Sequence, residues 1–152
     1  MKIQKDIKGF TFVELIMVIA ITFLIAAAVA PVYSNLQTSA QLNETTSQVV
    51  QFLRIGRQQS VDRFNNTNHG VYFQADRYTL YQGTSYAARN TAYDREVVLA
   101  DPLSISTSLT NDEVNFSKGL GEPNNMGNIT INHEIEGFKN ITINEYGAVG
   151  DN

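Results

Sequence analysis

A single carboxylate, Glu14, interrupts the most apolar stretch of the 152-residue sequence. Residues 10–33 read FTFVELIMVIAITFLIAAAVAPVY, and Glu14 is the one charged residue among them. A carboxylate at the centre of a membrane helix costs about 2.5–3.5 kcal/mol and usually has a partner. Two interpretations follow. Either Glu14 pairs with a cation in apolar surroundings, or it reaches the headgroups at the helix start, where it complements the helix dipole.

Other residues suited to catalysis or metal binding are sparse. The sequence has no cysteine, which excludes thiolate zinc sites, iron–sulfur clusters and cysteine nucleophiles, and it has two histidines, His69 and His133. His133 stands beside Glu134 and Glu136, but on a strand it points to the face opposite theirs, which argues against a metal site. No nucleophile–base pair or paired acid stands out. We therefore predict no catalytic residue, no metal and no cofactor.

Two further patterns resemble ligand sites without meeting their requirements. Gly119-Leu120-Gly121 lacks the following lysine and helix of a phosphate loop. A set of four acidic residues lacks the dense spacing of a calcium loop, so we expect a solvated acidic surface. These residues are Asp94, Asp101, Asp112 and Glu113.

The composition indicates a chain that builds a hydrophobic core. Of its residues 43% are hydrophobic, 10% aromatic and 17% charged, which excludes disorder of the whole chain. The formal net charge of -4 argues against a general nucleic-acid-binding protein, because such proteins usually carry a basic face.

Residues 10–33 are long enough to form a membrane helix, because about 20 apolar residues at about 1.5 Å each span the bilayer. Residues 1–9 precede them with three lysines and one aspartate. The positive-inside rule therefore places the N-terminus in the cytoplasm and the residues after Tyr33 outside. An ordinary secretory signal, cut within the alanine-rich end of the apolar stretch, is the alternative, but it leaves Glu14 unexplained.

The sequence from Lys8 to Leu15, KGFTFVEL, resembles the leader-peptidase site of type IV prepilins and type II secretion pseudopilins. The resemblance implies that residues 1–9 are a leader, which the prepilin peptidase removes after Gly9 on the cytoplasmic side. The same enzyme then methylates the new N-terminal residue, Phe10. Glu14 takes the place of the carboxylate at the fifth mature position, which acts in assembly.

The residues of this motif suit these roles. Gly9 has no side chain to obstruct a protease at the membrane surface. Cleavage leaves an α-amine beside hydrocarbon, and Glu14 of the same or a neighbouring subunit can neutralise it there. Pro31 stands where the family has a proline that bends or locally melts the helix, since proline removes a helix hydrogen bond. Alternatively, Pro31 marks the end of the membrane segment.

Residues 34–64 are predicted to continue as an amphipathic helix, to about Arg63, and residues 65–152 to form a β-rich head. Apolar and small residues at helical spacing predict the face that a sheet covers. They are Leu42, Val49, Leu53, Gly56, Ser60 and Phe64, flanked by Val50, Phe52 and Val61. Arg54, Arg57 and Arg63 are expected to form a solvated face near the helix end.

The period changes from 3.6 to 2 after the loop at residues 65–70. Near-copies of one pentapeptide, Asn128–Asn132 and Asn140–Asn144, predict the two arms of a hairpin. The fold class is α+β, with a long N-terminal helix packed on a small antiparallel β-sheet head, as in pilins. The expected strands are residues 71–74, 77–81, 96–99, 104–106 and 114–116, and the expected loops are 83–95 and 118–127.

The order of these elements resembles the GspH/FimT class of minor pilins and pseudopilins. Residues 56–61, GRQQSV, are similar to the helix end of that class, and residues 71–81 to its strand pair. Phe116 with Gly119, and Gly147, take the places of later family positions.

Some FimT-like minor pilins bind DNA through a basic patch near the C-terminus. Here residues 144–152 are acidic, and removal of residues 1–9 takes the formal charge from -4 to -6. Because phosphate contacts need lysine or arginine, DNA uptake is a minor alternative.

These observations predict a structural subunit of a type IV pilus or type II secretion pseudopilus, and not an enzyme. The expected partners are prepilin peptidase/N-methyltransferase and other pilin or pseudopilin subunits. We expect a single-pass protein of the inner membrane with its head outside, which then enters a surface or periplasmic filament. The alternative is a membrane-anchored extracytoplasmic binding module with an uncleaved signal anchor.

Overall fold

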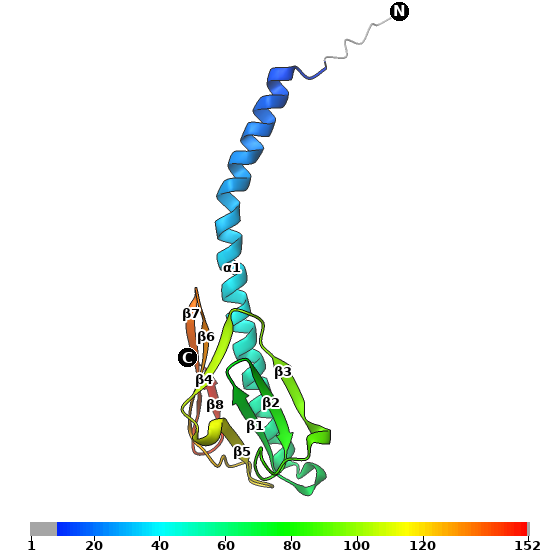
Figure 1. Ribbon diagram of the computed structural model, residues 1–152, viewed down its shortest axis with the longest axis vertical. Helices are drawn as coiled ribbons and strands as arrows, with labels where there is room; N and C mark the ends of the chain where they lie inside the picture. The colour runs from blue at the N-terminus through cyan, green and yellow to red at the C-terminus, as the bar shows by residue number, and fades with distance from the viewer. Residues whose placement is uncertain (1–8, 152) are drawn as a thin grey trace, which may run out of the picture. The chain divides into compact units, whose positions relative to one another are not determined.

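The computed structural model describes residues 9–151, except for the side chains of residues 28–36 and 151. Residues 1–8 of the expected leader lie outside the described residues. The chain divides into two compact units, residues 1–37 and residues 38–152. The latter is called the head below. The helix α1 (Phe12–Val61) is the secondary structure of the first unit and begins the second (Figure 1).

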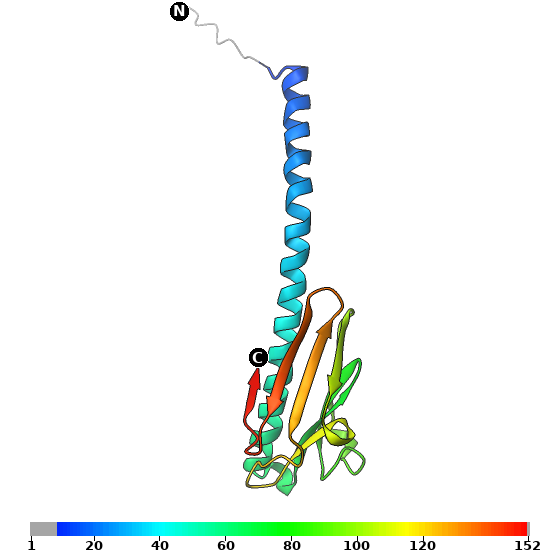
Figure 2. The ribbon, with the colours of Figure 1, turned by 90° about the vertical axis from the view of Figure 1, so that its left-hand side faces the viewer.

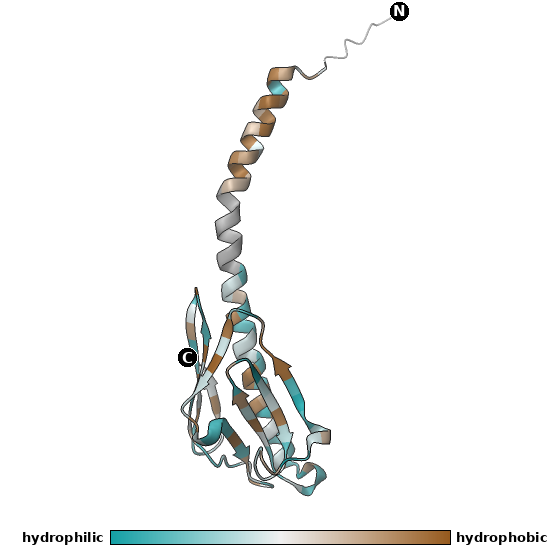
Figure 3. Cartoon of the chain, viewed as in Figure 1, coloured by the Kyte–Doolittle hydropathy of each residue, from teal (hydrophilic) through white to brown (hydrophobic). Residues whose placement is uncertain are grey.

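The N-terminal part of α1 is apolar on all sides. Its large side chains from Phe12 to Ile25 are half to three-quarters exposed, and Figure 3 shows the hydrophobic colouring over these first turns. Among the described residues, no helix meets the combined length and hydropathy needed to cross a membrane. The expected membrane segment, residues 10–33, is therefore not confirmed.

The helix ends two residues earlier than the sequence pattern predicts. The last helical residue is Val61, and Arg63 adopts left-handed backbone angles of φ 55° and ψ 35°. The chain turns there into a short 3-10 segment, Phe64–Asn66. Phe64, which we expected on the buried face, is therefore 50% exposed, because it no longer follows the helical repeat. The expectation for Val61 is also wrong, since this side chain is 37% exposed.

Two four-stranded antiparallel sheets complete the head. The first sheet has the order β3-β2-β1-β5, and the second has the order β4-β6-β7-β8 (Figures 1 and 2). The two sheets meet where the amide of Ile105 donates to the carbonyl of Ala75 at 2.9 Å. The strands are β1 (His69–Gln74), β2 (Arg77–Gln82), β3 (Arg95–Val98), β4 (Leu103–Thr107), β5 (Glu113–Phe116), β6 (Gly127–His133), β7 (Gly137–Ile143) and β8 (Val149–Asp151).

One hydrophobic core joins α1 to both sheets. The predicted helical face is largely confirmed: Leu42, Val49, Val50 and Leu53 are buried. They pack with side chains of the first sheet and of the second. Gly56 lies on the same face, where an added Cβ would stand 3.1 Å from Cδ1 of Leu80. The small residue therefore lets α1 approach β2 closely.

The pentapeptide repeat forms the predicted hairpin, β6–β7. The two copies pair antiparallel, with Asn128 opposite Thr142 and Thr130 opposite Asn140. Each threonine hydroxyl donates to the asparagine of the other copy, at 3.1 Å and 2.8 Å respectively. The isoleucines of both copies alternate with these pairs and are fully buried. The repeat therefore supplies one polar face and one core face.

Candidate processing and assembly site

Gly9 and Phe10 precede the helix and are open to solvent. Neither residue has helical or strand structure, and a Cβ added to Gly9 would meet no atom within 4 Å. The Phe10 side chain is 83% exposed. A peptide bond in such a position is accessible to a protease, because no neighbouring side chain of the described residues covers it.

Thr11 begins the helix, a role that our sequence interpretation missed. Its carbonyl accepts the amide of Leu15 at 3.1 Å, and its hydroxyl accepts the amide of Glu14 at 3.2 Å. This is the N-cap bond of a Thr-x-x-Glu capping box, in which the hydroxyl satisfies a helix amide that has no carbonyl partner. The spacing of Thr11 and Glu14 was a visible signal for it.

Glu14 lies in the first turn of α1 with an exposed side chain. It forms no ion pair with any described residue, whereas its apolar neighbours Val13 and Leu15 are 65% and 53% exposed. The position suits the positive end of the helix dipole. The chain thus presents one carboxylate on an otherwise apolar helical surface, one turn after Phe10.

Two further polar or helix-breaking residues lie along this segment. The hydroxyl of Thr22 donates to the carbonyl of Val18 at 2.7 Å, the back-bond that is inexpensive in an apolar helix. Pro31 lies within the backbone of α1, and its side chain is outside the described set. Its expected bending role stays a prediction.

Arg57, in the helix end GRQQSV, binds two loops of the head. Arg57, which we expected to be solvated, donates from Nε to the carbonyl of Gly121 at 3.2 Å and from a terminal nitrogen to the carbonyl of Tyr146 at 3.1 Å. Arg54 and Arg63 are exposed, as expected. The correction for Arg57 arises because its partners are 64 and 89 residues away in sequence, where periodicity carries no information.

His133 does not stand on a strand with the two glutamates beside it. β6 ends at His133, and Glu134 and Glu136 lie in the turn between β6 and β7. The buried His133 accepts the amides of Ile135 and Glu136 at its Nδ1 atom, at 3.2 Å and 3.3 Å. The expectation that these residues share a strand is therefore wrong, and the imidazole binds the backbone of the hairpin turn.

The four acidic residues singled out in the sequence are not one solvated surface. Asp94 is paired with Arg89 at 2.8 Å, and Asp112 accepts the hydroxyl of Thr107. Glu113 is 7% exposed, so the expectation of solvation is wrong for it. No group of three or more histidine or acidic residues among the described residues is arranged to hold a metal ion.

Glu113 anchors the loop that follows β2. Its carboxylate accepts the hydroxyl of Tyr81 at 2.8 Å and the amide of Tyr86 at 2.7 Å. Asn115 donates to the same hydroxyl at 3.0 Å. Burial raises the pKa of Tyr81, so that its hydroxyl stays protonated as a donor. The Tyr86 ring stacks on Tyr72 with centroids 3.8 Å apart, which fixes the loop against the sheet.

Comparison with known proteins gives a family match for the N-terminal segment and similar solved structures for the fold. Residues 4–30 match the family model described as the prokaryotic N-terminal methylation motif. The structure is similar to the minor pseudopilin EpsH from the type 2 secretion system of Vibrio cholerae, with 15% identity, coverage of 74% of this chain and 96% of EpsH, and a TM-score of 0.57. It is also similar to the type IV minor pilin FimU of Pseudomonas aeruginosa, with 12% identity, coverage of 74% and 88%, and a TM-score of 0.59.

At these identities the similarities establish the fold. A comparison with curated proteins gives no match. The chain therefore carries the N-terminal methylation motif of prokaryotic prepilin-like proteins, on the α+β fold that it shares with minor pilins and pseudopilins.

Proposed function

We propose that this protein is a structural subunit, a minor pilin or pseudopilin, of a type IV pilus or a type II secretion pseudopilus. The observation that carries the proposal is the placement of Glu14 on the exposed apolar start of α1, within the matched residues 4–30. A helix whose described large side chains from Phe12 to Ile25 are apolar and exposed needs lipid or sister helices around it. The proposal assigns the chain an assembly role in place of catalysis.

Processing in this proposal occurs between Gly9 and Phe10. The prepilin peptidase hydrolyses that peptide bond, and a methyl group is added to the α-amine of Phe10. Two features support this assignment: the bond lies before the first helical residue, Phe12, and Gly9 has open space around its Cα. Removal of residues 1–9 leaves the apolar helix in the mature chain as anchor and assembly surface.

Before assembly, the proposed state is a single-pass protein of the inner membrane. Three lysines in residues 1–9 favour a cytoplasmic N-terminus, which places the head outside. During assembly, the apolar surface of α1 exchanges lipid for neighbouring helices. Pro31 is proposed as the point where the helix bends or locally melts, because it lacks an amide proton.

Glu14 supplies the directed interaction in that exchange. After cleavage the α-amine of Phe10 carries a positive charge at neutral pH. Glu14 of the same or a neighbouring subunit balances this charge. Two opposite charges attract strongly in apolar surroundings, and removal of one partner of a buried pair costs about 3–5 kcal/mol. The ion pair therefore favours one alignment of neighbouring α1 helices, whereas apolar contacts alone permit many alignments.

The test is incorporation of Glu14→Gln into filaments in the protein's own host. Sheared filaments and membranes are separated, and the chain is quantified in each fraction. We expect Glu14→Gln to accumulate in membranes with at least a tenfold loss from filaments. Glu44→Gln is the matched control, because Glu44 is an exposed carboxylate on the head portion of the same helix. Equal incorporation of Glu14→Gln and wild type contradicts the proposal.

A further inference from the structure

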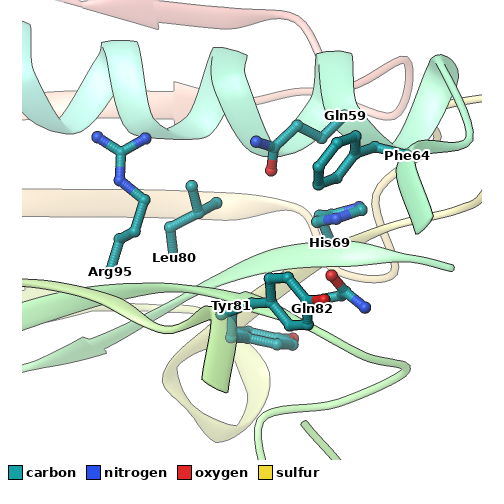
Figure 4. A pocket seen from close by; sticks show the side chains of 8 residues that line it. Gln59, Phe64, His69, Leu80, Tyr81, Gln82 and Arg95 are labelled. Atoms are coloured by element: carbon teal, nitrogen blue, oxygen red, sulfur yellow. The ribbon is translucent and has the colours of Figure 1, made fainter. Parts of the chain in front are cut away.

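A cavity of about 150 Å³ lies in the head, between the C-terminal turns of α1 and the first sheet (Figure 4). Its walls come from α1, β1, β2 and β3, with Phe64 contributed by the 3-10 segment after α1 and Tyr93 by the segment between β2 and β3. The volume corresponds to about five water molecules at about 30 Å³ each. It is below the roughly 300–1,000 Å³ of pockets for drug-sized ligands, so a fitting ligand is small.

His69 places unpaired polar atoms at this cavity. The residue is 2% exposed, and neither Nδ1 nor Nε2 has a hydrogen-bond partner among the described residues. Burial lowers the pKa of His69, so the imidazole is neutral and offers one donor and one acceptor. A buried polar group without a partner costs about 1–3 kcal/mol, and native proteins rarely leave one. A bound group that hydrogen-bonds His69 removes this cost.

The polar groups that line the cavity are mainly donors. Arg95 lies with its guanidinium over the Phe52 ring, 5.4 Å from the centroid, and forms no ion pair with a described residue. The side-chain oxygen Oε1 of Gln82 already accepts from Nδ2 of Asn65 at 2.8 Å, so the side-chain NH₂ of Gln82 is the donor that it can offer to a ligand. None of the residues lining the cavity is acidic. This donor excess favours an anionic ligand.

The arrangement along the cavity defines the shape of that ligand. Figure 4 shows Arg95 at one end and His69 at the other, with Leu80 between them. The aromatic ring of Phe64 also lines the wall, whereas the Tyr81 ring lies on the opposite face of β2 from Leu80, where its hydroxyl contacts Glu113 and Asn115. The ends are thus polar and the middle is apolar.

We propose that this cavity binds a small carboxylate with an apolar body, whose carboxylate pairs with Arg95 and whose far end carries a polar group that hydrogen-bonds His69. Leu80 and the Phe64 ring contact the apolar body. This site belongs to the head and is independent of the processing and assembly role of the N-terminal helix. The same chemistry is found in a free hydroxyaryl acid and in a protein chain that ends in tyrosine.

The test uses the full chain in detergent micelles with isotope-labelled histidine. The sequence has two histidines, so His69 reports on the cavity and His133 serves as an internal reference. The probe is 4-hydroxybenzoate, followed by the imidazole NMR shifts. We expect a saturable shift at His69 and none at His133. 4-Hydroxybenzamide, which lacks the charge, should bind at least tenfold more weakly, and benzoate, which lacks the hydroxyl, about fivefold more weakly.

Two variants make the test independent of folding defects in the cavity wall. Arg95→Gln removes a guanidinium at an exposed position and should weaken 4-hydroxybenzoate at least tenfold, whereas Arg54→Gln, an exposed arginine outside the cavity, should leave affinity unchanged. The absence of a saturable shift, as in a cavity that holds water alone, overturns the proposal. Equal affinities for acid and amide, or for wild type and Arg95→Gln, overturn it as well.

A peptide that ends in tyrosine with a free carboxylate distinguishes the two sources of the ligand. Tighter binding of this peptide than of 4-hydroxybenzoate at the same His69 and Arg95 assigns the site to a protein chain end. Weaker binding assigns it to a free small molecule. Both results support the carboxylate chemistry of the cavity.

Discussion

Ser60 and His69 exchange hydrogen bonds through one hydroxyl. The Ser60 hydroxyl accepts the His69 amide at 2.8 Å and donates to the His69 carbonyl at 3.4 Å. Both residues are buried. Ser60 stands in the last turn of α1 and His69 is the first residue of β1, so this exchange fixes where the helix ends relative to the sheet. The carbonyl of Ser60 additionally accepts the amide of Gly119 at 2.8 Å.

Ser60→Ala should destabilise the head by about 1–3 kcal/mol, because the buried amide and carbonyl of His69 lose their hydrogen bonds to this hydroxyl while the side-chain volume barely changes. Thermal unfolding of the full chain, followed by the β-sheet circular dichroism signal, measures the effect. Ser104→Ala is the control, since Ser104 is an exposed serine on β4. Unfolding temperatures that coincide for the two variants would show that the Ser60 hydroxyl is dispensable.

Arg57→Lys should cost about 1 kcal/mol of stability although the charge is kept. The guanidinium reaches two carbonyls, of Gly121 and Tyr146, from separate nitrogens, and a lysine ammonium lacks that fork. The site is partly exposed, which limits the loss. Hydrogen exchange should become faster at residues 119–121 and 146–148. Arg54→Lys, at an exposed position on the same helix, should change neither quantity, and matching behaviour of the two variants would contradict the assigned role.

The lowered pKa of His69 should make the stability of the head depend on pH. Burial lowers the pKa of His69 below the value of 6.5 expected in the unfolded chain. Well above pH 6.5 both states are neutral at this site, and His69 adds no pH dependence. As the pH falls below 6.5 the unfolded state takes up the proton first, so stability declines by up to about 1.4 kcal/mol per pH unit until the folded-state pKa is reached.

The comparison of wild type with His69→Gln isolates this effect, because glutamine does not titrate and His133 is common to both chains. The free energy of unfolding is measured from pH 7.5 to pH 5.5. We expect the wild type to lose more stability than the variant over this interval. Parallel pH curves for the two proteins are the result that refutes the assignment.

A fourth prediction concerns Gly56. A leucine at this position would place its Cβ against Leu80, where the available distance is 3.1 Å, and the rest of the side chain would have to displace β2. Overpacking of this kind costs about 1–3 kcal/mol, even though leucine favours a helix more than glycine does. Gly150→Leu is the comparison variant, since a Cβ there meets nothing within 4 Å. A Gly56→Leu protein as stable as Gly150→Leu would remove the packing argument.

The elements that sequence reasoning placed correctly are those whose signal is local. The hairpin at Ala75 and Asp76 and the pentapeptide repeat depend on alternation and turn residues, and both form as predicted. The helical face of Leu42, Val49 and Leu53 follows a period of 3.6 and is buried. In each case the pattern lies within a short stretch of sequence, the longest being the repeat from Asn128 to Asn144.

The sequence predictions that proved wrong concern side chains whose contacts come from distant segments of the chain. Arg57 binds carbonyls more than 60 residues away, and Glu113 is buried by Tyr81 and by the loop containing Tyr86. Phe64 fits the helical repeat of the sequence, but the helix ends before it, because Arg63 has left-handed backbone angles. Tertiary contacts and backbone angles of this kind have no periodic signature. By contrast, the capping pair Thr11 and Glu14 had a local signature that was overlooked.

The most direct test of the proposed function is the N-terminus of the mature protein. The full chain is co-expressed with a prepilin peptidase and analysed by intact-mass and peptide mass spectrometry. We predict a chain that begins at Phe10 and carries one methyl group on its α-amine. A chain that still begins at Met1, or one that is cut within the alanine-rich end of the apolar stretch, would contradict the proposal that this protein is processed and assembled as a pilin-like subunit.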